Sequence, residues 1–96
     1  MFDQMKGFME MKKQADRIKR ELDGSLVEVN EVRGIKIVVN GSQNFKSIEI
    51  DDALVNAGNK RELETNILRG INEAIKKSQN LAAQKMRAVI PGLPGM

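Results

Sequence analysis

Residues 60–88 read KRELETNILRGINEAIKKSQNLAAQKMRA, a segment with no proline and a single glycine. Its apolar side chains recur at helical spacing and share an arc of about 140° on a helical wheel, which predicts one continuous amphipathic helix. At about 1.5 Å per residue this helix is roughly 43 Å long. Unbroken patterns of this length are typical of bundles, coiled coils and projecting arms. In a chain of 96 residues, we therefore expect a partner, most simply a second copy, to cover part of its apolar side.

The apolar arc of this helix contains one residue type that helices disfavour. Gly70 lies at its edge, and glycine costs a helix interior roughly 1 kcal/mol relative to alanine. We therefore expect Gly70 to mark a close contact of the helix. The arc itself is formed by Leu63, Ile67, Leu68, Ile71, Ala74, Ile75, Leu81, Ala82, Met86 and Val89.

A second amphipathic helix is predicted at the other end of the chain, over Asp3 to Leu22. Its apolar residues alternate at spacings of three and four, which is typical of a seam that faces a partner helix. Gly24 is expected to end this helix in the left-handed C-cap conformation. The seam consists of Phe8, Met11, Ala15, Ile18 and Leu22, and a second apolar patch consists of Phe2, Met5 and Met9.

These apolar side chains of the first helix are candidates for self-association. Core or dimer packing is the favoured interpretation, and a Met-rich contact with a membrane surface is the alternative. The predicted dimer interface comprises Phe2, Met5, Phe8, Met9 and Met11.

Between the helices, three short runs rich in β-branched residues predict an antiparallel meander. They cover Leu26 to Val32, Ile35 to Asn40 and Phe45 to Asp51, separated by Arg33-Gly34 and by residues 41–44. Apolar side chains alternate in each run, so each strand offers one face for helices to cover. The sequence thus predicts an α+β fold, in which a three-stranded antiparallel β-meander is flanked by a long N-terminal and a long C-terminal helix.

The segments around the long helix carry turn and cap signals. Residues 51–55 predict a brief helical turn capped by an Asp, and Asn59 with Glu62 resembles a capping box at the start of the long helix. We expect one domain over residues 1–90. Two prolines and two glycines in residues 91–96 predict a mobile C-terminal tail.

Composition argues against catalysis. The chain has no Cys, His, Trp or Tyr, which removes the thiolate nucleophile, the usual acid–base residue near neutral pH and the soft metal ligands. Glu49 and Asp51 share a strand face and are candidates for a hard cation, but capping of a turn is the favoured role of the aspartates. We expect no enzyme activity, no cofactor, no metal and no small-molecule substrate. Charges within the first twenty residues match neither a signal peptide nor a membrane span, which predicts a soluble, cytoplasmic protein.

Basic residues concentrate on the two predicted helices. The chain carries a net charge of +3, and on a helical wheel the helix cations lie opposite the apolar faces. Such stripes are suited to tracking phosphates, with release of counterions from a nucleic acid. The candidate DNA-binding residues are Lys6, Lys12, Lys13, Arg17, Arg20, Arg69, Lys76, Lys77 and Arg87.

Plain solvation of the helix surfaces is the competing interpretation of these stripes. Any amphipathic helix places charge opposite its apolar face, and Glu10, Asp16 and Glu73 are interspersed among the cations. Without Trp or Tyr, binding of single strands by base stacking is disfavoured. Duplex recognition would rest on phosphates and shape rather than on base contacts.

Several short motifs resemble the YbaB/EbfC family of bacterial nucleoid-associated proteins. The strand that ends in Asn40-Gly41, the next strand ending in Ile50-Asp51 and the start at residues 11–15 are similar to the family pattern, as are residues 72–74, 81–86 and 92–95. The resemblance implies a homodimer whose helices project like the arms of tweezers. It also implies binding of double-stranded DNA and organisation of the nucleoid, together with an effect on transcription.

Two other function classes remain open at this point. One is a protein-interaction adaptor that uses the N-terminal Met and Phe patch and the helical arms. The other is a peripheral membrane protein that uses the same patch. The DNA-binding homodimer with low sequence specificity is the favoured hypothesis, and we expect no membrane partner.

Overall fold

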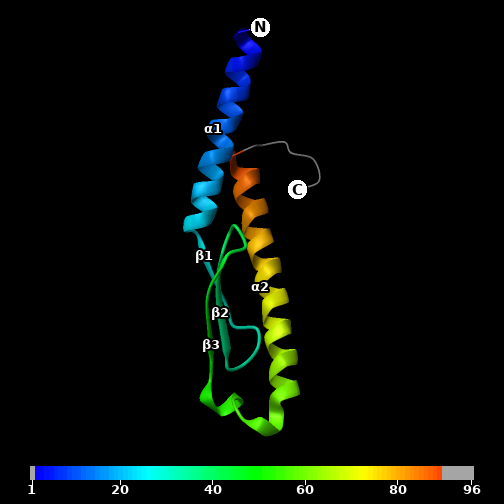
Figure 1. Cartoon of the computed structure of the whole chain (residues 1–96). Coiled ribbons are helices and arrows are strands. Elements are labelled where there is room, and N and C mark those ends of the chain that lie inside the picture. The colour runs from blue at the N-terminus through cyan, green and yellow to red at the C-terminus, as the bar shows by residue number, and fades with distance from the viewer. Residues whose placement is uncertain (1, 90–96) are drawn as a thin grey trace.

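The computed structural model of the chain describes residues 2–89, and the predicted tail at 91–96 lies outside them. The structure has two long helices and a three-stranded sheet that packs on α2, which confirms the predicted α+β class (Figure 1). In chain order the elements are α1 (Phe2–Gly24), β1 (Leu26–Val29), β2 (Ile35–Asn40), β3 (Phe45–Ile50), the short 3₁₀ turns η1 (Asp52–Leu54) and η2 (Ala57–Asn59), and α2 (Lys60–Val89).

The molecule is strongly elongated, with principal extents of 67 × 23 × 17 Å. The sheet packs along the N-terminal part of α2, and the C-terminal part of α2 lies beside α1 (Figure 1). The N-terminal half of α1 extends beyond the end of α2. The long helix α2 is therefore covered on one side along most of its length, and the projecting element is α1.

The sheet is an antiparallel meander in the order β1-β2-β3. Val29 lies opposite Ile37, and Ile37 lies opposite Ile48. The predicted extension of the first strand to Val32 is wrong, because β1 ends at Val29. The chain leaves the ladder there and closes a turn in which the Ile35 amide donates to the Val32 carbonyl oxygen at 3.0 Å.

Gly34 makes that turn sterically accessible. Its φ is +87°, the left-handed value that the third residue of a type II turn requires. The turn swings Val32 inward, so that this residue is 6% exposed and joins the core although it lies outside the strand. Alternation along the strand therefore does not account for its burial.

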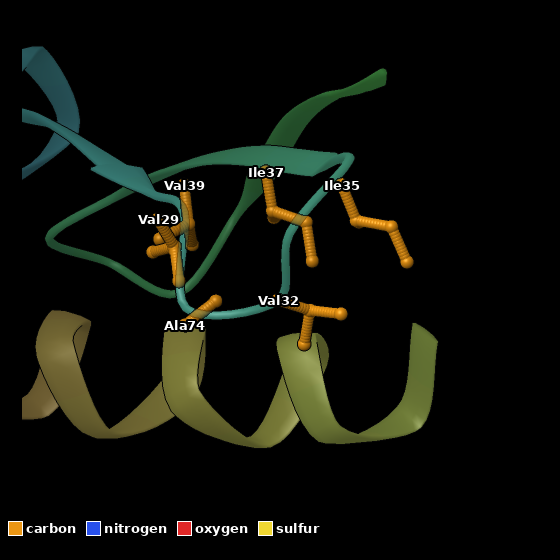
Figure 2. Packing of buried hydrophobic residues seen from close by; sticks show 6 residues of the cluster. All are labelled: Val29, Val32, Ile35, Ile37, Val39 and Ala74. Carbon is orange, nitrogen blue, oxygen red and sulfur yellow. The ribbon is translucent and has the colours of Figure 1, made fainter. Parts of the chain in front are cut away.

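The core lies between the sheet and α2. Figure 2 shows Val29, Ile37 and Val39 directed toward the helix, with Ala74 on the helix side. These four residues are at most 1% exposed. Burial of apolar surface at about 25 cal/mol per Å² makes this cluster the main source of stability. Val32 and Ile35 complete the cluster.

Small residues on α2 allow the helix to approach the sheet closely. Gly70, Ala74 and Ser78 recur at every fourth position and are all buried. A Cβ atom built on Gly70 would lie 2.9 Å from Cδ1 of Ile37. The expectation that Gly70 marks a close contact is therefore confirmed, and its partner is the sheet.

Part of the apolar surface is left uncovered. Helix α2 packs over β1 and β2, whereas Phe45 and Ile48 on β3 are 46% and 47% exposed. Leu68, which lies at one side of the apolar arc of α2, is 60% exposed. The chain alone thus leaves part of both the sheet and the long helix without apolar cover.

Three predicted caps are wrong in detail. Gly24 does not adopt a positive φ. The carbonyls at the end of α1 instead accept hydrogen bonds from Ser25, Gly41 and Asn40. Asp51 occupies the N-cap position of η1 without a side-chain capping hydrogen bond. No capping box forms at Asn59, because its Oδ1 atom is buried without a hydrogen-bond partner. The side chain of Asn56 caps the preceding turn η2.

Candidate nucleic-acid interface

The basic residues of α1 form an exposed row. Lys6, Lys13, Arg17 and Arg20 are all exposed and follow one side of the helix, as the wheel predicts. The opposite side carries Ile18, which is 6% exposed and packs into the body. The row is therefore directed away from the body, and Lys12 is also exposed, beside it. We refer to Lys6, Lys12, Lys13, Arg17 and Arg20 as the α1 basic stripe.

The basic residues of α2 are spread along the helix. Arg69 lies in the N-terminal third of α2, and Arg87 lies in its last turn. The rise of an α-helix separates them by about 27 Å. Arg69, Lys76 and Arg87 are exposed. We call these three residues with Lys77 the α2 basic stripe.

Two lysines of the α2 basic stripe have carboxylate partners. The Nζ atom of Lys77 lies 2.9 Å from Oε1 of Glu31, and Nζ of Lys76 lies 3.4 Å from Oε1 of Glu73. The hydrogen bond from Lys77 and its charge lower the pKa of Glu31. Lys77 thus helps to attach the loop after β1 to α2. The pair of Lys76 and Glu73 is exposed, and exposed ion pairs contribute little to stability.

On the sheet surface that faces away from α2, one lysine lies between two carboxylates. Nζ of Lys36 lies 3.0 Å from Oε1 of Glu28 and 3.8 Å from Oε2 of Glu49. The hydrogen bond from Lys36 to Glu28, with the charges of both carboxylates, raises the pKa of Lys36. A cation on this surface is already engaged by two acidic residues, so the surface is unsuited to a polyanion.

The sequence offered Glu49 and Asp51 as candidates for a hard cation. Glu49 is paired with Lys36. Among residues 2–89, no group of three carboxylates gathers as a set of metal ligands. Neither described helix combines the length and the apolarity that a membrane crossing requires.

An apolar groove runs along the seam of α1. It has a volume of about 600 Å³ and is bounded on the α2 side by Met86. Its α1 side is lined by Met11, Gln14, Ala15, Ile18, Lys19 and Leu22. Farther along α1, Met5, Phe8, Met9 and Met11 are 62–71% exposed. These four residues belong to the predicted dimer interface, whereas the side chain of Phe2 lies outside the described part of the structure.

Sequence reasoning missed two buried polar residues that join the helices to the sheet. Asn40 is 1% exposed and Ser78 is 0% exposed. The Ser78 hydroxyl donates to the Asn40 carbonyl oxygen at 2.8 Å. Ser78 lies within the apolar arc of α2 on the wheel. A polar residue at that position could have indicated a buried hydrogen bond.

Comparison with known proteins identifies relatives of the whole chain. The model of the YbaB/EbfC DNA-binding family matches residues 1–93. A nucleoid-associated protein of Dictyoglomus thermophilum is 31% identical over 97% of this chain and 90% of its own length. A nucleoid-associated protein of Pelotomaculum thermopropionicum is 33% identical over 97% of this chain and 94% of its own.

A solved structure supports the fold independently. The crystal structure of an uncharacterised protein from Helicobacter pylori aligns with a TM-score of 0.74 and 17% sequence identity. The alignment covers 88% of this chain and 90% of that chain. At this level of identity the likeness concerns the fold alone.

Proposed function

The chain belongs to the YbaB/EbfC DNA-binding family, and from this premise we propose that it binds duplex DNA as a homodimer through the basic stripes of α1 and α2. It is a DNA-binding, nucleoid-associated protein. The single observation that carries the assignment is the match of the family model over residues 1–93. It favours DNA binding over the adaptor alternative.

The distribution of charge supports the two stripes as the DNA surface. On the outer face of the sheet, Lys36 is paired with two carboxylates. The α1 basic stripe, in contrast, is exposed and directed away from the body. Lysine and arginine side chains that neutralise phosphates release counterions, which provides affinity without base readout. The proposed binding is therefore of low sequence specificity. Its proposed effects are organisation of the nucleoid and an influence on transcription, which places the protein in the cytoplasm at the nucleoid.

Uncovered apolar surface supports the homodimer. Phe8 and Met11 on α1 are 71% and 69% exposed, and the groove beside them is lined mainly by apolar side chains. Contiguous exposed apolar surface is typical of protein association sites. A second copy supplies a matching surface, and the projecting halves of two α1 helices then form the arms of a tweezer-like assembly.

A salt-titrated gel shift with duplexes of mixed sequence, beside sedimentation of the free protein, tests this proposal. We expect a dimer mass and retention of all duplexes. The logarithm of the association constant should fall by about 0.9 per phosphate contact for each tenfold rise in salt concentration. The double variant Arg17→Glu and Lys76→Glu should bind at least about tenfold more weakly and reduce the salt slope by about two for each chain of the dimer that contacts the duplex.

The matched control reverses two charges elsewhere. Arg33 and Lys46 are exposed and lie outside both stripes, so the double variant Arg33→Glu and Lys46→Glu should bind DNA nearly as well as the unmodified protein. Equal losses in the control and in the stripe variant would show that only net charge matters. A chain that sediments as a monomer at all concentrations would exclude the dimer, and failure to retain duplexes in dilute buffer would exclude the DNA surface.

A further inference from the structure

Three elements of the fold meet at Asn40, the last residue of β2. Its side-chain Nδ2 donates to the carbonyl oxygen of Asp23 near the end of α1, at 3.2 Å. Its own carbonyl oxygen accepts from the hydroxyl of Ser78 in the middle of α2, at 2.8 Å. Asn40 thus connects the sheet to both helices, and Asn40 and Ser78 are almost fully buried.

The turn after Asn40 is built to lie against α1. Oδ1 of Asn40 accepts from the amides of Ser42 and Asn44 at 3.0 and 2.9 Å, which fixes the shape of the turn. The Gly41 amide donates to the Leu22 carbonyl oxygen at 2.9 Å. A Cβ atom on Gly41 would lie 2.7 Å from Cδ2 and 3.2 Å from Cα of Leu22, so a larger residue would require the turn or the end of α1 to shift.

These contacts replace the cap that the sequence predicted for α1. The last carbonyls of a helix have no partner within the helix. The neighbouring Ser25 binds two of them, since its hydroxyl donates to the Glu21 carbonyl oxygen at 2.6 Å and its amide to that of Leu22 at 3.2 Å. From outside the helix, Gly41 also donates to the Leu22 carbonyl oxygen, and Asn40 donates to that of Asp23. The Ser42 hydroxyl also donates to the Asp23 carboxylate. The end of α1 is therefore capped by Ser25, which follows it in the chain, and also by the β2–β3 turn, a different element of the fold.

Capping by another element fixes the direction of the helix as well as its end. Hydrogen bonds are directional, whereas apolar contacts such as that of Ile18 are not. From Gly24 to Phe2, helix α1 is about 33 Å long, so a rotation of about 10° at its capped end moves the far end by about 6 Å. Small changes at the junction thus produce large displacements of Lys6 and Lys13.

We propose that Asn40 and Ser78 are positioning residues, which hold α1 at a fixed orientation relative to α2 and thereby set the spacing between the two basic stripes. The orientation of α1 is inferred from the hydrogen bonds of Asn40 and Ser78 alone, whereas the consequence for DNA binding rests on the proposed function. A helix that is free to pivot must be ordered when DNA binds, and this ordering lowers affinity.

Two variants separate the junction from the surrounding core. Asn40→Asp keeps an acceptor for the amides of Ser42 and Asn44 but places an oxygen opposite the Asp23 carbonyl. Ser78→Ala removes one hydroxyl and keeps the small volume against the sheet, so it provides a test even if Asn40→Asp fails to fold. The matched controls are Asn56→Asp, whose acceptor role toward Gly58 lies in η2, and Ser47→Ala on the exposed part of β3.

The absence of cysteine makes the geometry directly measurable. Spin labels on Glu10→Cys and Gln79→Cys, both exposed sites, report the distance between α1 and α2 by pulsed electron paramagnetic resonance. The labelled chain is diluted with excess unlabelled chain so that distances within one chain dominate. The same variants without labels are then titrated with duplex DNA.

We expect Asn40→Asp and Ser78→Ala to broaden or shift the distance distribution, while both controls retain the original one. We expect DNA affinity to fall about tenfold for Asn40→Asp and about threefold for Ser78→Ala. An unchanged distribution in both folded junction variants overturns the positioning role. A changed distribution with unchanged DNA affinity overturns the link to DNA, and failure of the unmodified protein to bind DNA overturns the proposed function and leaves the distance result valid.

Discussion

The N-terminal part of α2 and the N-terminal half of α1 have similar sequence patterns and opposite surroundings. Both present apolar side chains at spacings of three and four. On α2 these positions include Ala74, which is 0% exposed under the sheet. On α1 they include Phe8 and Met11, which are 71% and 69% exposed.

The difference arises from what lies opposite each helix. Small residues at Gly70, Ala74 and Ser78 bring α2 close to the sheet, whereas the first half of α1 extends past the end of α2. Helical periodicity therefore specifies which face is apolar, and the rest of the fold specifies whether that face is covered. A covered face contributes to folding, and an uncovered one is available for association.

The largest effect should come from removing apolar volume in the covered region. Ile37→Ala deletes a side chain that is 1% exposed, and we expect it to lower the free energy of unfolding by about 2–5 kcal/mol. Phe8→Ala should change the same quantity by less than about 0.5 kcal/mol in dilute protein. Urea unfolding at one fixed protein concentration measures both.

In self-association, measured at higher protein concentration, Phe8→Ala should have a larger effect than Ile37→Ala. Sedimentation should show self-association at least about tenfold weaker for Phe8→Ala, because that side chain is expected in the dimer interface. Val55→Ala, at another exposed apolar site, serves as the control. If Phe8→Ala lowers dilute-solution stability as much as Ile37→Ala does, the two regions belong to one core and the comparison fails.

An intermediate effect is expected from glycine replacement in the two helices. A Cβ on Gly7 meets nothing within 4 Å, whereas one on Gly70 meets Ile37 at 2.9 Å. Gly7→Ala should therefore gain up to about 1 kcal/mol of local helix stability from propensity, and Gly70→Ala should lose most of that gain to crowding. Amide hydrogen exchange in each helix measures both, and equal gains at the two sites would contradict the close contact at Gly70.

The smallest effect should be the pH dependence that Glu31 contributes. Lys77 lowers the pKa of Glu31 below its ordinary value of 4.5. A carboxylate with a lowered pKa in the folded state stabilises that state above the unfolded pKa, and this stabilisation is lost as the pH falls through the lowered value. Denaturant midpoints measured from neutral pH to below 4.5 should therefore fall slightly less steeply in Glu31→Gln.

The control for this measurement is Glu10→Gln on the exposed part of α1. It should follow the unmodified protein across the whole range of pH. A Glu31→Gln profile that coincides with both would show that the pair of Glu31 and Lys77 does not contribute to stability in solution.

Most of the fold was predictable because it depends on patterns that are local in the sequence. The predicted helix over 60–88 matches α2, and the second predicted strand, Ile35 to Asn40, matches β2. The first strand was predicted three residues too long. Val32 is apolar because it packs into the core, although it does not lie in the strand, and the alternating pattern does not distinguish these two cases. Val32 packs into the core from a turn that Gly34 closes.

The candidate site was predictable only in part. The wheel placed Lys13 and Arg17 on an exposed face, and the structure has them there. It did not reveal that Lys77 is paired with Glu31, since these residues are far apart in the sequence. The DNA contacts and the dimer interface stay predictions.

By itself, the sequence determined the helices, the strands and the face that each presents, because periodicity and turn residues act over a few neighbours. Only the tertiary structure decided which groups bind the Asp23 carbonyl at the end of α1 and how α1 is oriented. Asn40 and Asp23 are separated by 17 positions, and Asn40 and Ser78 by 38. A hydrogen bond across such separations depends on the folding of everything between its partners, so no local pattern specifies it.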